Sequence, residues 1–259
     1  MRALKLTLAY DGTRFVGWQR QAHGESIQGL LEDALARFEG APVTVHGAGR
    51  TDAGVHALGQ VASATIACGH DTGALARGLN AILPADIRVL DVREAPPGFH
   101  ARFSARSKTY RYVLRNAAIV SPFERAYVWH VPEPLDLDAM RTAAAALIGT
   151  HDYSAFRSTG SDVTSPVRTI TRSEITSGEP QRARPTSSTT REDALIAYDI
   201  EGDGFLRHMV RAIVGTLVEI GRGRRPAASI GALLDGGQRA EAGATAPPQG
   251  LFLVGVNYD

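Results

Sequence analysis

Asp52 lies in the segment of this 259-residue chain whose residue types are best suited to chemistry. Residues 49–57 form a glycine-flanked turn between two apolar, strand-like stretches, which presents the carboxylate of Asp52. Gly49 and Gly54 can take backbone angles that other residues avoid, so the loop can approach a ligand closely, and Arg50 offers donors beside the acid. Such a carboxylate can act as a nucleophile or as a base. The same pattern also fits a tight turn closed by an Asx hydrogen bond.

Metal and cofactor chemistry find little support in the sequence. The chain has one cysteine, Cys68, and its eight histidines are scattered, without the spacing of a zinc site. Residues 47–54 are rich in glycine but lack the Lys-Ser/Thr ending of a phosphate-binding loop. We therefore expect an enzyme without a metal or a cofactor.

The composition indicates a globular protein of the cytoplasm. A hydrophobic content of 44% over 259 residues is enough for one large domain or two small ones. A single cysteine forms no intrachain disulfide, which favours a reducing compartment. The N-terminus lacks the apolar core of a secretory signal, and no segment is apolar enough to span a bilayer, so we expect no membrane association.

Basic residues gather in two clusters although the net charge is only +1. The first falls in residues 95–123, which contain no acidic residue, and the second in residues 207–225, where Glu219 is the one acid. Such a distribution suits a polyanion bound on one face, and an ordinary solvated surface is the alternative. The clusters consist of Arg102, Arg106, Lys108, Arg111 and Arg115, and of Arg207, Arg211, Arg222, Arg224 and Arg225.

The apolar periodicity predicts the order strand, helix, strand, strand, helix, strand twice over. This order predicts an α+β protein made of two ferredoxin-like (RRM-like) βαββαβ units with mainly antiparallel sheets, an N-terminal half of residues 1–104 and a C-terminal half of residues 105–259. Ser26 is a candidate N-cap and Gly40 a candidate stop for the first helix. The predicted strands are residues 3–10, 43–47, 59–67, 87–93, 108–115, 167–175, 195–201 and 251–256, and the predicted helices are residues 27–38, 74–83, 137–148, 205–220 and 227–234.

Residues 176–193 are polar and contain prolines, without a periodic apolar face. The pattern predicts a hairpin loop there. Its three arginines could contact RNA, but a tolerated surface insertion is the simpler interpretation.

Motifs along nearly the whole chain resemble the family of pseudouridine synthases that modifies tRNA at positions 38 to 40, in the anticodon stem and loop. Residues 49–57 are similar to the active-site motif of that family, and the other motifs follow in the same order. Two departures are the long segment 176–193, where the family has a shorter turn, and Asp203, where many relatives have asparagine. The matching motifs are Tyr10-Asp11-Gly12-Thr13 with Phe15, Gly17-Trp18-Gln19 and Gln21; Asn80 with Leu83-Pro84 and Asp86-Ile87; Phe99-His100-Ala101-Arg102-Phe103; Tyr110-Arg111-Tyr112; Ser154-Ala155-Phe156; Arg168-Thr169-Ile170; Phe205 with His208-Met209-Val210-Arg211; and Pro247 with Gly250-Leu251.

The resemblance implies a pseudouridine synthase fold, a homodimer, tRNA as substrate, and isomerisation without a cofactor. It also implies that Asp52 is the catalytic carboxylate, acting on the sugar or the base by a pathway that the sequence leaves open. Arg211 would be the cation that keeps this carboxylate ionised beneath a flipped base. Tyr110 would stack on the target uracil and assist loss of the C5 proton.

Two further site residues follow from the resemblance: Arg50, which would help to extrude the target nucleotide, and Leu251, which would pack near the catalytic tyrosine. Each of these residue types also has an ordinary structural interpretation. A tyrosine that alternates with an arginine is typical of a half-buried strand. An arginine beside an apolar helix stripe is usually solvated, and the predicted helix 205–220 places Arg207 and Arg211 together beside such a stripe.

Two other functions stay open. A noncatalytic RNA-binding module or chaperone on RRM-like sheets would use the basic clusters without Asp52. A phosphoryl-transfer or hydrolytic enzyme would use Asp52 with a metal, but no second carboxylate converges on the motif.

Overall fold

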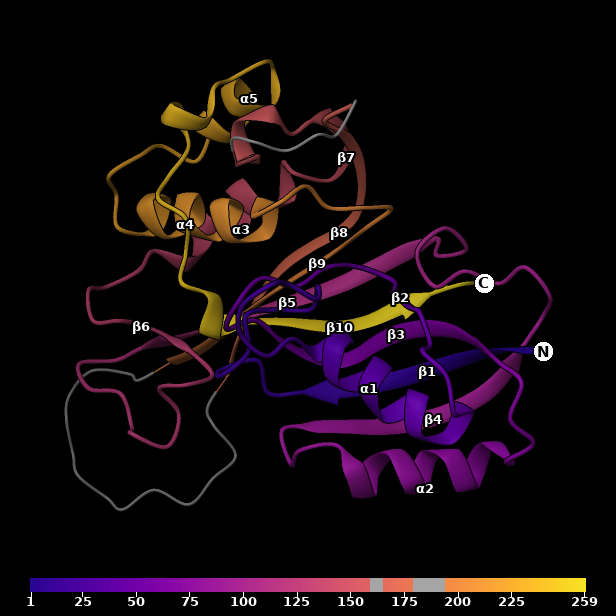
Figure 1. The fold of residues 1–259 in the computed structure, drawn as a ribbon. Coiled ribbons are helices and arrows are strands. Elements are labelled where there is room, and N and C mark those ends of the chain that lie inside the picture. Colours follow the sequence, from indigo (N-terminus) through magenta and orange to yellow (C-terminus); the bar gives the residue numbers. More distant parts are fainter. Residues whose placement is uncertain (159–164, 179–193) are drawn as a thin grey trace. The chain divides into compact units, whose positions relative to one another are not determined.

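The computed structural model describes residues 1–158, 165–178 and 194–259, and it has the predicted mixed α+β class with mostly antiparallel strands (Figure 1). The chain forms two compact units. Unit 1 comprises Met1–Lys108 and Phe252–Asp259, and unit 2 comprises Thr109–Leu251. The last strand of the sequence therefore belongs almost entirely to the first unit.

Unit 1 is a sheet with the strand order β4-β1-β3-β10, and the short β2 pairs with β3. The pairs β1–β3, β1–β4 and β2–β3 are antiparallel, whereas β10 runs parallel to β3. Helices α1 and α2 pack against each other, because a Cβ on Gly78 would lie 2.5 Å from the ring of Phe38. The elements are β1 (Arg2–Tyr10), α1 (Ile27–Glu39), β2 (Val45–Gly47), β3 (His56–Ile66), α2 (Thr72–Ile82), β4 (Ile87–Ala95) and β10 (Leu251–Asn257).

Helix α1 begins and ends where the sequence predicts. The side chain of Ser26 accepts a hydrogen bond from the N–H of Gly29, and Gly40 has a left-handed backbone with φ 75°. Leu31 and Leu35 on its inner face are buried. Both predicted caps are confirmed.

Unit 2 is a sheet with the strand order β5-β9-β8-β7, and β6 pairs with β5. The short strands β6 and β7 are absent from the predicted set, because three or four residues carry too little alternation to be recognised. The predicted loop 176–193 lies mostly outside the described residues, and residues 176–178 belong to β8. The elements are β5 (Ser107–Asn116), β6 (Trp129–Val131), α3 (Leu137–Ala145), β7 (Gly149–Asp152), η1 (Ser154–Phe156), β8 (Val167–Gly178), β9 (Ala194–Gly202), α4 (Met209–Gly221), α5 (Ser229–Leu234), η2 (Arg239–Glu241) and η3 (Pro248–Gly250).

Helix α4 begins four residues later than predicted. His208 has a left-handed backbone with φ 62°, the one such non-glycine residue among those described, and the carbonyl of Arg207 accepts from the N–H of Ser158 at 3.2 Å. The prediction that Arg207 and Arg211 share a helix face is therefore wrong. The predicted apolar residues Leu206, Val210, Ile213 and Leu217 are buried, and burial extends around α4 to every residue except Arg211 and Glu219.

Candidate active site

The loop that carries Asp52 is a tight turn in unit 1, between β2 and β3. The N–H of Val55 donates to the carbonyl of Asp52 at 3.1 Å, and Gly54 supplies the left-handed conformation that the turn needs, with φ 77°. Asp52 is half-buried, Arg50 is exposed, and Thr51 between them is buried. The turn thus leaves the carboxylate of Asp52 partly exposed.

A buried polar network holds the residues that precede Asp52. The hydroxyl groups of Tyr10 and Thr51 lie 2.8 Å apart, and Nε2 of Gln60 donates to the carbonyl of Gly49 at 2.8 Å and to the Tyr10 hydroxyl at 3.4 Å. Burial raises the pKa of Tyr10 to about 12. Loss of one partner leaves a buried polar group unsatisfied, which costs roughly 1–3 kcal/mol, so the network fixes the loop firmly.

The segment after β1 supports the same loop from another side. The N–H of Trp18 donates to the carbonyl of Thr51 at 3.0 Å. A Cβ on Gly17 would lie 2.5 Å from that carbonyl oxygen, and a Cβ on Gly12 would lie 2.0 Å from the carbonyl oxygen of Val55. Sequence reasoning recognised both glycines as parts of a motif but missed that they let one backbone lie directly against the other.

His56 ties this loop to two neighbouring segments. Its ring is buried, Nδ1 accepts from the N–H of Gly12 at 3.1 Å, and the ring stacks on Phe252 of β10 at 4.8 Å. The motif histidine is therefore a structural residue of unit 1.

Tyr110 lies on β5 in unit 2, where its side chain is buried. Its ring meets the ring of Phe205 edge-on, with centroids 5.0 Å apart and an interplanar angle of 77°. Phe205 belongs to the loop before α4, so Tyr110 packs on the segment that leads to Arg211. Leu251, at the start of β10, is buried as well.

Arg211 lies in the first turn of α4, and its guanidinium is held by backbone. Its Nε donates to the carbonyl of Ala246 at 2.7 Å, while the N–H of Ala246 donates to the carbonyl of Arg211 at 3.0 Å. The segment around Ala246 lies flush on the helix, because a Cβ on Gly215 would sit 1.7 Å from the carbonyl oxygen of Ala244. The orientation of the Arg211 side chain is thus fixed by two chain segments.

Tyr112 is a buried neighbour of Arg211, and the charge of Arg211 affects its pKa. Its hydroxyl donates to the carbonyl of Pro247 at 2.7 Å. Burial raises the pKa of Tyr112, and the charge of Arg211 acts in the opposite direction. Tyr112 is therefore part of the support around Arg211.

The predicted site residues fall into two groups. Asp52 and Arg50 lie in unit 1, and Tyr110, Arg211 and Leu251 lie in unit 2. Within unit 2, the carbonyl of Ala246 accepts a hydrogen bond from Arg211, and the chain then continues from Ala246 through η3 to Leu251.

Part of the basic clusters is neutralised by carboxylates. Arg111 makes two hydrogen bonds to Asp199, at 2.8 and 2.9 Å, so it serves the pairing of β5 with β9. Such arginines contribute less to a polyanion site than the sequence alone indicates. The paired arginines and their partners are Arg111 with Asp199, Arg115 with Glu124, Arg222 with Glu133, and Arg225 with Glu219.

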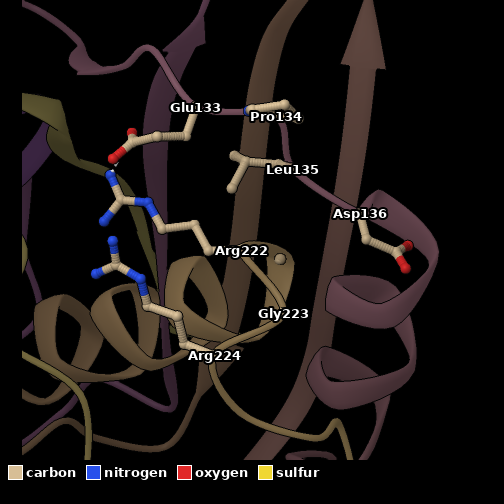
Figure 2. Close-up of a pocket in the computed structure, with 8 residues that line it drawn as sticks. Glu133, Pro134, Leu135, Asp136, Arg222, Gly223 and Arg224 are labelled. Atoms are coloured by element: carbon tan, nitrogen blue, oxygen red, sulfur yellow. Dashed lines mark hydrogen bonds and ion pairs between the residues drawn. The ribbon is translucent and has the colours of Figure 1, made fainter.

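A hollow of about 500 Å³ lies at the C-terminal end of α4 in unit 2 (Figure 2). Arg222 donates to Glu133 across it at 2.7 Å, and Arg224 lies beside Arg222. Cations at a helix C-terminus complement the helix dipole, which accounts for both arginines. None of the predicted site residues lines this hollow.

Residues 1–158, 165–178 and 194–259 offer neither a cluster of metal ligands nor a helix that could cross a membrane. No group of three or more His, Cys, Asp or Glu residues there is placed to hold a metal ion. No helix in the same ranges is long and apolar enough to cross a membrane.

Comparison with known proteins finds relatives that match the whole of this chain. The family model described as tRNA pseudouridine synthase matches residues 7–104 and 143–259. The tRNA pseudouridine synthase A of Myxococcus xanthus is 48% identical over 258 residues, covering 100% of this chain and 92% of the relative. The enzymes of that name from Moorella thermoacetica and Syntrophotalea carbinolica are 45% and 44% identical, over 100% of this chain and 100% and 97% of the relatives. The chain therefore belongs to the tRNA pseudouridine synthase family.

Proposed function

We propose that this protein isomerises uridine to pseudouridine in tRNA, at positions 38, 39 and/or 40 of the anticodon stem and loop. The observation that carries the proposal is the loop of Asp52. It presents a half-buried carboxylate on a turn that two glycines and a buried network hold in place. A family member with this loop has the acid that the reaction needs.

The reaction breaks the bond between C1′ of the ribose and N1 of uracil, turns the base, and joins C1′ to C5. The proton at C5 then leaves, and N1, which has lost its bond to the sugar, takes up a proton. Atoms and electrons balance within the nucleotide, so neither an oxidant nor an added group is consumed. Asp52 acts as the nucleophile or as the base that starts this sequence.

We assign supporting roles to the residues of unit 2. Arg211 is the fixed cation that keeps Asp52 ionised when a base covers it, because enclosure without a cation raises the pKa of a carboxyl group. The bond from its Nε to Ala246 supports this role, since it fixes the guanidinium in advance. Tyr110 stacks on the extruded uracil and assists loss of the C5 proton, and Leu251 packs beside it.

Arg50 helps to extrude the target nucleotide. The support is its exposed position, two residues before Asp52 and next to the buried Thr51. A flexible cation there can take over contacts that the nucleotide leaves, while the backbone beneath stays fixed by the Thr51 contacts.

The proposal also includes the fold of each half, the assembly and the cellular location. We infer a ferredoxin-like half on each side of residue 104, a homodimer that binds tRNA across both subunits, and a place in the cytoplasm. The strand order β4-β1-β3-β2 with antiparallel pairs supports the first half, because it is the order of a split βαβ unit.

A panel of tRNA transcripts tests the proposed positions. Each transcript keeps a single uridine at position 38, 39 or 40, and a fourth has none. Pseudouridine is mapped by mass spectrometry after incubation with the protein. We expect product only in transcripts with a uridine at these positions, and product in the fourth transcript would contradict the assignment.

A further inference from the structure

The motif at residues 99–103 builds an exposed row of aromatic rings in unit 1, for which the activity above supplies no role. The rings of His46 and His100 stack with centroids 4.7 Å apart and an interplanar angle of 29°. The ring of His100 also lies 4.3 Å from that of Phe103. Phe103 is 76% exposed, so the row ends in an open aromatic face.

Hydrogen bonds hold this row rigidly on the sheet. The N–H of Ala101 donates to Oγ of Ser63 at 3.0 Å, and the hydroxyl of Tyr258 donates to the carbonyl of Ala101 at 2.7 Å. Nδ1 of His100 accepts from the N–H of Phe103 at 3.3 Å. Because this backbone is fixed and the rings already contact one another, a ligand that stacks on them orders little additional structure.

The surroundings of the row are cationic. The guanidinium of Arg102 lies 5.6 Å from the centroid of the Phe103 ring, and it forms no ion pair within the described part of the chain. Residues 95–123 contain no acid. Burial and the neighbouring His46 and Arg102 lower the pKa of His100.

The row is also packed against the loop of Asp52. Ala48, which precedes Gly49 of that loop, forms one buried cluster with Val61 and with Ala101 of the aromatic segment. A nucleotide bound on the row would therefore lie on the same unit as the catalytic carboxylate, on a segment that packs against its loop.

We propose that His46, His100 and Phe103 form a stacking site for an unpaired nucleotide of the RNA substrate, with Arg102 contacting its phosphate. An open ring face next to a cation fits a nucleotide, because every base has a π face and every nucleotide carries a phosphate. This inference rests on the proposed function, since it names a second contact of the same substrate.

Three variants of the full-length protein test the site by their affinity for a tRNA anticodon stem-loop at fixed ionic strength. Phe103→Ala should weaken binding about tenfold, in the range for loss of one base stack. Phe103→Trp should keep the affinity, and its fluorescence should be quenched when RNA binds. Phe123→Ala removes a phenylalanine that is 89% exposed in unit 2, and it should leave the affinity unchanged.

Wild-type affinity in Phe103→Ala would overturn the inference, and so would unchanged fluorescence of Phe103→Trp when RNA binds. A change in self-association of Phe103→Ala by light scattering, with unchanged RNA affinity, would instead assign the row to contact with a second copy. Thermal unfolding checks that each variant is folded. Tritium release from the same RNA labelled at C5 of uridine tests the proposed function separately, because an inactive protein can still lose affinity through Phe103.

Discussion

Replacing Gly17 by alanine should displace the loop of Asp52 without unfolding the protein. The new Cβ would lie 2.5 Å from the carbonyl oxygen of Thr51 and 3.0 Å from the carbonyl carbon of Asp52. Ordinary contact begins at 3.4 Å, so the loop must recede by roughly half an ångström to one ångström. Misplacement of a catalytic group by about 1 Å can cost on the order of 100-fold in rate. We expect kcat to fall by about 10- to 100-fold.

Gly40→Ala is the matched control for Gly17→Ala. Both glycines have positive φ, 75° at Gly40 and 106° at Gly17, but no atom lies within 4 Å of a Cβ built on Gly40. Both substitutions therefore carry a left-handed backbone strain of about 1–2 kcal/mol, and only Gly17→Ala adds the collision.

The assay pairs thermal unfolding with single-turnover rates at saturating protein. Both variants should lose several degrees of melting temperature, and Gly40→Ala should keep the wild-type rate. A folded Gly17→Ala with the wild-type rate would refute the reasoning that the segment after β1 positions Asp52.

Three further predictions concern the supports of the site. Thr51→Val should lower the single-turnover rate about tenfold and Thr51→Ser should restore most of it, because only serine keeps the hydroxyl that meets Tyr10; equal rates in the two variants would contradict this. Arg211→Leu should slow the single-turnover rate by more than tenfold while the dissociation constant for tRNA changes little, and a loss confined to binding would contradict the assigned role. The raised pKa of Tyr10, about 12 against the ordinary 10.0, means that the folded state holds this proton more tightly than the unfolded state. Its contribution to stability is complete below pH 10 and is lost between about pH 10 and 12, with a slope of about 1.4 kcal/mol per pH unit. Tyr10→Phe should therefore show a shallower loss of unfolding free energy between about pH 10 and 12 by urea denaturation, and an unchanged slope would count against a buried, neutral Tyr10.

The sequence predicts much of the fold because local signals agree with the tertiary structure. Ser26 and Gly40 bound α1 as their types indicate, and the alternation in β1 reflects burial of one face, with Leu4, Leu6 and Leu8 inside. The start of α4 is different, because Leu206 is buried although it is not helical. Periodicity of apolar residues reports burial, so it extends the helix too far.

The candidate site shows the same division between local and tertiary information. The turn at Asp52 depends on Gly54, two residues after it, which a single sequence displays. The contacts of Gly12 and Gly17 with that turn join segments about 40 residues apart, and nothing in the spacing of the motifs reveals which loop they touch. The left-handed backbone of His208 is also not revealed by the sequence, because glycine is the residue that most often takes this conformation.

Tritium release from tRNA labelled at C5 of uridine, with wild-type protein beside Asp52→Asn in a buffer that chelates metals, tests the central claim most directly. Substitution at C5 frees the label, and the amide of asparagine keeps the shape of the carboxylate without its charge. We expect stoichiometric release by the wild type and none by a folded Asp52→Asn that still binds tRNA. Release by Asp52→Asn at the wild-type rate, or no release by a wild-type protein that binds tRNA tightly, would contradict the account.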